Sequence, residues 1–299
     1  MSGRPFGLSE DPFVEGHDAR FVYPSRAHRE VVARLRHGIE SRGPFLQLTG
    51  VPGVGKTIAV HAALAGVDPH TLVAIVASPS LGPVTFLERL LAGFAPGALK
   101  APAPAPPAEG IEARLRAVRA CGQLALLVVD EAQNLAPPLF EELRVLSDLE
   151  NDGHPLLQVI LVGQPDLEDE LSRPGCDALR QRIAVHCRLD ALSGDETEEY
   201  IGHRVSVAGG DPAALFTSES CRAVHRLTHG IPREVNLVAG EALMLANTAG
   251  EHTVTAGHMA GDADHPGGSL RKCTPCSSGS LAAWDCRRMR RPTPARGRA

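Results

Sequence analysis

The sequence predicts an α/β fold built on a parallel sheet with helices on both faces, followed by a smaller all-helical region. Five short apolar runs suit strands buried on both faces, as in parallel sheets, and segments with helical periodicity lie between most of them. From residue 193 to about residue 260 only helical periodicity remains. The expected strands are residues 45–49, 71–77, 124–130, 156–162 and 183–189.

Composition is that of an ordinary soluble globular protein. The 299 residues can bury a large core in one or two domains, with 43% hydrophobic and 22% charged residues. Aromatic residues are only 4%, which argues against stacking on single-stranded nucleic acid. The N-terminus has no signal-peptide core and the longest apolar run, residues 124–129, is far too short to span a membrane. We therefore expect no transmembrane segment and a cytoplasmic location, with reduced cysteines.

Charge is distributed unevenly along the chain. The net charge is −5, but residues 262–299 contain eight Lys/Arg and three Asp, which leaves the remaining body at about −10. An acidic body does not favour a general DNA-binding surface. The basic tail lacks periodicity and is expected to be disordered, and its Cys273, Cys276 and Cys286 make only half of a zinc site.

A phosphate-binding loop follows the first expected strand. Residues 50–57 match G-x-x-x-x-G-K-[ST] without a gap, and a helix follows. Glycines let backbone N–H groups approach phosphate oxygens, and the helix N-terminus adds its dipole. The alternative is a glycine-rich turn before an ordinary helix. The predicted nucleotide-binding residues are Gly50, Val51, Pro52, Gly53, Val54, Gly55, Lys56, Thr57 and Ile58.

Two carboxylates end the third expected strand. Asp130 is predicted to hold Mg²⁺ together with the Thr57 hydroxyl, and Glu131 to polarise the attacking water as a general base. Both follow a parallel strand at its carboxyl end, where open α/β sheets bind ligands. The alternative is a helix-capping acidic pair.

Three polar side chains further along the chain are candidates for contact with the γ-phosphate. Gln164 follows the fourth strand, with a plain turn as its alternative reading. Arg182, next to Arg180, could reach a neighbouring subunit's nucleotide or be a solvated surface residue. Arg233 starts a helix and could fold over the γ-phosphate or remain exposed in the first turn.

The boundaries follow from composition. Residues 1–24 form an irregular N-terminal strap whose aromatic residues either pack over the core or flank the adenine ring. Residues 25–191 form the nucleotide-binding α/β domain, including a surface insertion rich in Ala and Pro at 96–110 and a helix at 111–121. Residues 192–261 form the lid, with a capping box at Ser193–Glu196 and helices to 208 and at 218–228, 230–248 and 256–260. Residues 262–299 are the tail.

Taken together, these motifs resemble an AAA+ ATPase, and more narrowly the ATPase domain of the general secretion pathway protein A family. The resemblance covers about residues 4–260. It rests on Asp11-Pro-Phe13, the phosphate loop, the run Val129–Leu135, Leu161–Pro165, Gln181-Arg-Ile183 and Gly230–Asn236.

The resemblance has specific implications for fold and site. It implies a five-stranded sheet of order 5-1-4-3-2, with Gln164 as sensor 1, Arg182 as arginine finger and Arg233 as sensor 2. Members of the secretion family continue into a transmembrane helix and a periplasmic region, whereas this sequence ends in an arginine-rich tail.

Three functions follow as hypotheses. The first is a Mg²⁺-dependent ATPase, oligomeric and peripheral at the inner membrane, that serves assembly of a secretion or pilus system through a protein partner. The second is a DNA-associated ATPase that assists transposition, which the basic tail supports and the acidic body disfavours. The third is a scaffold that binds ATP but barely hydrolyses it, against which Glu131 argues.

Overall fold

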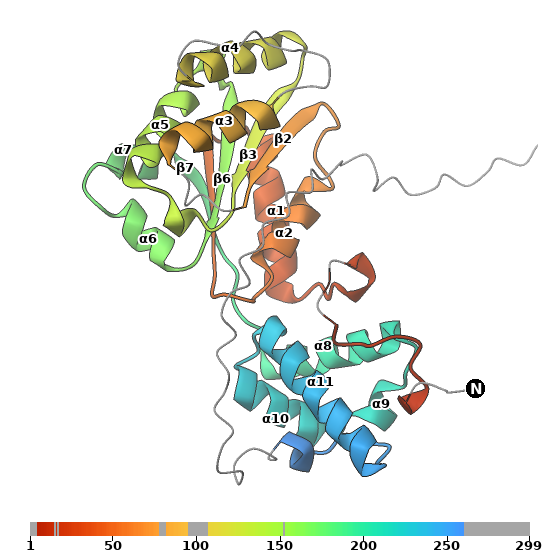
Figure 1. Ribbon diagram of the computed structural model, residues 1–299. Helices are drawn as coiled ribbons and strands as arrows, with labels where there is room; N and C mark the ends of the chain where they lie inside the picture. Colours follow the sequence, from red (N-terminus) through yellow and green to blue (C-terminus); the bar gives the residue numbers. More distant parts are fainter. Residues whose placement is uncertain are drawn as a thin grey trace, which may run out of the picture. The chain divides into compact units, whose positions relative to one another are not determined.

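Figure 1 shows the computed structural model, which describes residues 5–14, 16, 18–77, 82–94, 107–151 and 153–259. The chain divides into two compact units, residues 1–260 and 261–299. The expected basic tail, its cysteines and most of the Ala/Pro-rich insertion lie outside the described residues.

A five-stranded parallel sheet forms the centre of the α/β domain. Its order is β2-β3-β6-β1-β7, and each neighbouring pair is parallel. Counted along the chain, this is the predicted order 5-1-4-3-2, with β6 between β1 and β3. The strands are β1 (Phe45–Thr49), β2 (Thr71–Val76), β3 (Leu124–Val129), β6 (Leu157–Gly163) and β7 (Ile183–Arg188).

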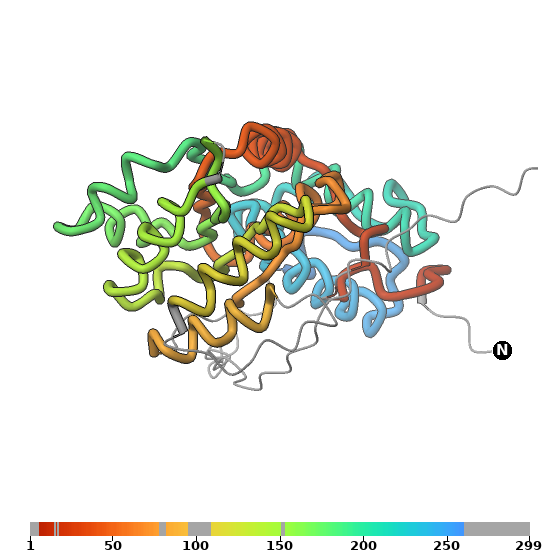
Figure 2. Tube along the Cα trace, turned by 90° about the horizontal axis from the view of Figure 1, so that it is seen from above, coloured from red at the N-terminus to blue at the C-terminus, as the bar shows by residue number. Residues whose placement is uncertain are grey.

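Helices cover both faces of this sheet. Alternate strand residues supply two separate cores: Leu46 and Leu48 of β1 face α1 (Arg26–Glu40) and α2 (Lys56–Leu64). Phe45 of the same strand faces the opposite core, formed with α3 (Pro83–Gly93), α4 (Pro107–Ala120) and α5 (Pro137–Ser147). Figures 1 and 2 show α1 on one side of the sheet and α3 and α4 on the other. Burial on both faces explains why the central strands β1, β3 and β6 read as continuous apolar runs.

In the α/β domain, a helix start and a hairpin differ from expectation. Helix α4 begins at Pro107, four residues before the expected start at Ile111, because Pro is well tolerated in the first turn and Glu109 follows it there. A hairpin of β4 (Glu150–Asn151) and β5 (His154–Pro155) was not expected, since strands of two residues leave no periodic signal.

The lid is helical, as the periodicity predicts. It contains α8 (Gly194–Val207), α10 (Ser218–Thr228) and α11 (Pro232–Ala249). The capping box is present: the Ser193 hydroxyl accepts a bond from Glu196 N–H, and the Glu196 carboxylate accepts from Ser193 N–H. The expected helix at 256–260 is instead a 3₁₀ turn, η4 (Ala256–Met259), and the short α9 (Pro212–Leu215) was not expected.

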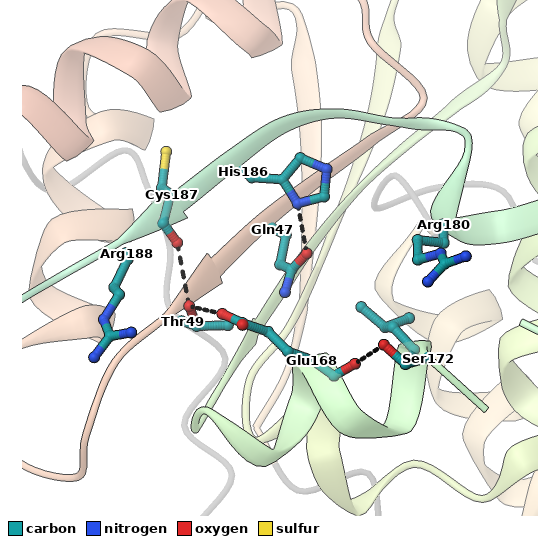
Figure 3. A pocket seen from close by; sticks show the side chains of 9 residues that line it. Gln47, Thr49, Glu168, Ser172, Arg180, His186, Cys187 and Arg188 are labelled. Atoms are coloured by element: carbon teal, nitrogen blue, oxygen red, sulfur yellow. Dashed lines mark hydrogen bonds between the residues drawn. The ribbon is translucent and has the colours of Figure 1, made fainter. Parts of the chain in front are cut away.

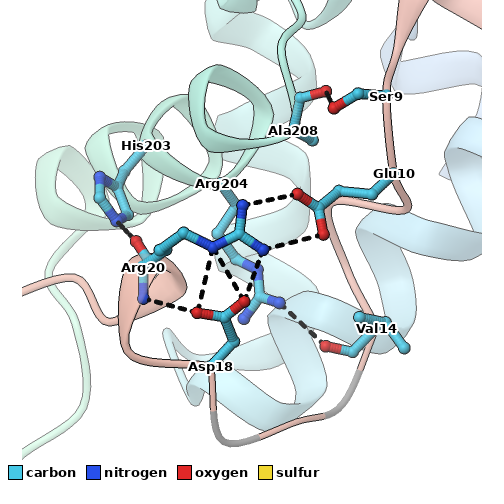
Figure 4. A network of polar contacts seen from close by, with 8 residues as sticks. All are labelled: Ser9, Glu10, Val14, Asp18, Arg20, His203, Arg204 and Ala208. Carbon is cyan, nitrogen blue, oxygen red and sulfur yellow. Dashed lines mark hydrogen bonds and ion pairs between the residues drawn. The ribbon is translucent and has the colours of Figure 1, made fainter. Parts of the chain in front are cut away.

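The N-terminal strap packs against the lid. Leu8, Phe13 and Phe21 are buried in the lid core. Figure 4 shows the polar side of this contact, where the buried Arg204 of α8 donates to Val14 O at 2.9 Å. The Arg204 guanidinium also donates to the backbone carbonyl of Pro12 and lies 4.8 Å from the centre of the Phe21 ring. The burial of Phe13 and Phe21 agrees with the alternative in which the aromatic residues of the strap pack over a core.

No helix in the described ranges is both long enough and apolar enough to cross a membrane.

Candidate functional site

The phosphate loop connects β1 to α2 in the geometry that its sequence predicts. Gly53 and Gly55 have φ values of +82° and +100°, which glycine adopts at little cost. Helix α2 begins at Lys56, directly after Gly55. The loop therefore ends at a helix N-terminus, whose N–H groups and dipole favour an anion.

Lys56 is buried within the loop. Its ammonium group donates to Gly50 O at 2.9 Å and to Val51 O at 3.2 Å, so the side chain curls over the loop. Burial lowers the pKa of Lys56, while the charges of Glu131 and Asp130 act to raise it. A phosphate group would replace two carbonyl partners with charged oxygens, a stronger interaction for an ammonium group.

Thr57 and Asp130 form the candidate metal position. The Thr57 hydroxyl donates to Asp130 Oδ2 at 2.8 Å, so the two oxygens are already adjacent. Mg²⁺ prefers oxygen ligands and is held by one or two protein groups together with substrate phosphates, which this pair fits. Within the described residues no group of three or more His, Cys, Asp or Glu could hold a metal without such help.

Glu131 lies next to this pair in an unusual backbone conformation. Its φ of +54° is left-handed, which is uncommon for residues other than glycine, and its N–H donates to Asp130 Oδ1 at 3.0 Å. Strained backbone of this kind is concentrated at functional sites. The conformation sets the Glu131 side chain immediately beyond the end of β3.

Gln164 contacts Glu131 across the sheet. Its side-chain amide donates to Glu131 Oε2 at 3.2 Å, because β6 neighbours β3 and both strands end at the same edge. Gln133 joins them: its amide donates to Glu131 Oε2 at 2.6 Å and accepts from Gln164 N–H at 3.1 Å. The structure therefore brings the expected base and the expected sensor together.

Arg233 lies on the phosphate loop. Its N–H donates to Gly53 O at 3.3 Å, and a Cβ on Gly53 would meet Arg233 Cβ at 2.9 Å. The positive charge of Arg233 also acts to lower the pKa of Lys56, although this effect is smaller than those of burial and of the Glu131 and Asp130 carboxylates. The start of α11 is therefore adjacent to the phosphate loop.

Arg182 is not part of this cluster in the single chain. Its guanidinium pairs with Asp148, the residue that caps the C-terminus of α5, and donates to Ser147 Oγ at 3.4 Å. A cation at a helix C-terminus is itself stabilising, which is a sufficient structural reason for the pair. Arg180 is exposed nearby and pairs with Asp177.

A separate cavity of about 310 Å³ lies at the β7 side of the sheet (Figure 3). Gln47 and His186 are hydrogen-bonded in its wall at 2.9 Å, and Thr49 donates to Glu168 of α6 (Asp166–Leu171) at 2.9 Å. Its lining shares no residue with the phosphate loop or with Asp130 and Glu131. The cavity is therefore a distinct feature and not the nucleotide position.

Gln133 is the residue of this cluster that sequence reasoning missed. It lies in the Val129–Leu135 run on which the resemblance rests, but the sequence predicts no role for it. The available signal was its spacing of two residues from Glu131 in a short turn after the strand. That spacing alone does not show where an amide points.

Comparison with known proteins agrees with this geometry. Residues 39–171 match the AAA domain family model. General secretion pathway protein A of Aeromonas hydrophila is 36% identical over 254 residues, which are 85% of this chain and 46% of that protein. The chain thus spans about half the length of this relative.

Solved structures show the same fold at low sequence identity. The Aeropyrum pernix ORC2 protein in its ADP form gives a TM-score of 0.61 at 16% identity, covering 84% of this chain and 70% of that one. The Thermotoga maritima RuvB branch migration motor gives 0.54 at 16% identity, covering 84% and 72%. Cdc6p from Pyrobaculum aerophilum gives 0.60 at 14% identity, covering 80% and 68%.

Residues 39–171 therefore form an AAA domain, and the sheet order and the phosphate loop give the chain the fold of the P-loop AAA+ ATPases. Within that class, the predicted resemblance to general secretion pathway protein A is confirmed.

Proposed function

We propose that the chain binds Mg²⁺-ATP at the phosphate loop and hydrolyses it with Glu131 as general base. The observation that carries this proposal is the convergence of Lys56, Thr57, Asp130, Glu131 and Gln164 at the carboxyl ends of β1, β3 and β6. These groups supply a cation for the phosphates, oxygen ligands for a metal, and a carboxylate for a water.

Each residue then has one task. Lys56 exchanges its carbonyl partners for phosphate oxygens. Thr57 and Asp130 hold Mg²⁺, which when bound neutralises charge on the phosphates. Glu131 accepts the proton of the attacking water, and the Gln164 amide stays within reach of both the carboxylate and that water.

The two arginines act from different positions. Arg233 lies beside the loop of its own chain and is assigned to the γ-phosphate of the same chain's nucleotide. Arg182 is held by Asp148 away from the cluster, so it acts on the nucleotide of a neighbouring copy in an oligomer. An arginine supplied in trans stabilises transition-state charge in phosphoryl transfer.

We assign the biological role to a secretion or pilus system of the cell envelope, with the chain acting in the cytoplasm at the inner membrane. The support is the sequence relative, whose name is General secretion pathway protein A. A protein partner in that system receives the conformational change that hydrolysis drives.

A DNA-associated function is the second candidate. ORC2 and RuvB share the fold, but at 16% identity they support only the fold. DNA titration separates the two candidates: we expect ATP turnover that is independent of added duplex DNA. Stimulation that falls steeply with salt would instead favour the DNA-associated ATPase.

A further inference from the structure

Gln133 is a polar residue of the Asp130–Leu135 segment that the proposed function leaves without a task. It lies in the 3₁₀ turn η3 (Ala132–Asn134), directly after Asp130 and Glu131. Its side chain is half-buried, whereas its neighbour Asn134 in the same turn is exposed. The turn therefore directs one amide into the structure and the other to solvent.

Both the oxygen and the nitrogen of the Gln133 side-chain amide make hydrogen bonds. Its oxygen accepts from the backbone N–H of Gln164 at 3.1 Å, which fixes the orientation of the amide. Its nitrogen donates to Glu131 Oε2 at 2.6 Å. Since the Gln164 side chain donates to the same oxygen at 3.2 Å, the three residues form a closed ring of hydrogen bonds.

The end of β6 is shaped to admit this ring. A Cβ on Gly163 would lie 2.8 Å from Gln133 Oε1 and 2.9 Å from Leu167 Cδ2. The φ of Gly163 is not left-handed, so the absence of a side chain serves space and not backbone conformation. The position of the Gln133 amide is thus set by the backbone at the end of β6.

Two donors on one carboxylate oxygen restrain the carboxyl group of Glu131. Rotation of that group would break both bonds, so its plane is fixed relative to β6. The other oxygen, Oε1, receives no donor from this pair and remains available to a water. A base that must sit within hydrogen-bond distance of an attacking water benefits from such restraint, because small misplacements are costly in rate.

We propose that Gln133 is a positioning residue for hydrolysis: it fixes the Glu131 carboxylate and couples it to the backbone at Gln164. This inference rests on the proposed function, in which Glu131 is the general base. In this role Gln133 acts through Glu131, to which its amide donates.

The test compares ATP turnover and ATP affinity in the full chain carrying Gln133→Met, which keeps the length of the side chain but removes its donor and its acceptor. We expect kcat to fall between roughly 10- and 100-fold, with KM and the Kd for ATP within about twofold of wild type. Gln133→Ala is the second variant, and melting temperatures with ATP affinities establish that both fold. Asn134→Ala is the matched control and should leave kcat unchanged, because its side chain is exposed.

The decisive comparison repeats Gln133→Met in a Glu131→Gln background. If Gln133 acts through Glu131, the Gln133→Met substitution should not further lower the residual turnover of the Glu131→Gln variant. An unchanged kcat in wild-type background, or an equal loss in both backgrounds, overturns the inference alone. If Glu131→Gln turns over ATP like wild type, the proposed function falls and the inference falls with it.

Discussion

The carboxylate of Glu196 accepts a hydrogen bond from the backbone N–H of Arg26 at 2.9 Å. Glu196 belongs to the first turn of α8, the first helix of the lid, and Arg26 is the first residue of α1 in the α/β domain. The other oxygen of the same carboxylate accepts from Ser193 N–H at 3.1 Å. One side chain thus ties together the two places where the chain passes between lid and α/β domain.

Removal of this carboxylate should destabilise the protein in a pH-dependent way. Partial burial acts to raise the pKa of Glu196, but bonds from Arg26 and Ser193 outweigh it and hold the pKa below its ordinary value of 4.5. The charged form therefore stabilises the fold fully above about pH 4.5, and this contribution is lost as pH falls through the lower folded pKa.

We expect Glu196→Gln to lower the free energy of unfolding by about 1 kcal/mol at pH 7, as loss of a capping interaction does. The difference from wild type should shrink when urea unfolding is repeated near pH 3. Asp195→Asn removes the same charge from the same turn at an exposed position and serves as control. A deficit that is equal at both pH values would contradict this assignment.

Gly230 should not tolerate a side chain. Its φ is +73°, and a Cβ there would clash with the backbone oxygen of Leu192. The N–H of Leu192 in turn donates to Gly230 O at 2.9 Å. Gly230→Ala should cost at least ~1 kcal/mol in unfolding free energy, because strain and clash add. Gly250 is the control position for strain without a clash: its φ is +74°, and a Cβ there would have no atom within 4 Å. Equal losses for the two alanine variants would rule out the backbone clash as a cause.

Alanine variants of Lys56 and Thr57 should lose ATP affinity in distinguishable ways. Lys56→Ala removes the buried cation of the loop and should abolish most ATP affinity with or without Mg²⁺. Thr57→Ala removes one partner of Asp130 and should weaken binding mainly when Mg²⁺ is present. Calorimetry with and without EDTA measures both. Wild-type affinity in Lys56→Ala would show that the loop does not hold the phosphates as described.

Arg182 should matter only between copies of the chain. Because Asp148 holds it away from its own site, specific activity should rise with protein concentration, and Arg182→Ala should lower it. Mixing Arg182→Ala with Glu131→Gln should recover some turnover, since one kind of mixed interface has both a good base and a good arginine. Activity that is independent of concentration, without recovery on mixing, would leave Arg182 as a structural cation at the end of α5.

Much of the fold was predictable because its signals are local. The strands of a sheet covered on both faces must be apolar throughout, and the phosphate loop is defined by eight consecutive residues, Gly50–Thr57. The capping box at Ser193–Glu196 was likewise predictable from the sequence, although the hydrogen bond from Arg26 N–H to Glu196 was not. A capping residue signals its own helix and says nothing about a segment 170 residues away.

The features that were missed depend on contacts between distant segments. The aromatic residues of the strap indicate that the strap is buried, but not which surface covers it. In the structure they pack against the lid. Gln133 gains its place from β6, and Arg182 from the end of α5. No pattern within a single window of sequence encodes such partners, because each is fixed by how strands and helices meet.

The central claim is that Glu131 is the base for hydrolysis of ATP held by the phosphate loop. The most direct test measures ATP affinity by calorimetry and turnover by phosphate release in wild type and Glu131→Gln. The account predicts a Kd within about twofold of wild type, since Glu131 is not assigned to binding, and a turnover lower by roughly 10²- to 10⁴-fold. Turnover near the wild-type value, with affinity intact, would contradict it.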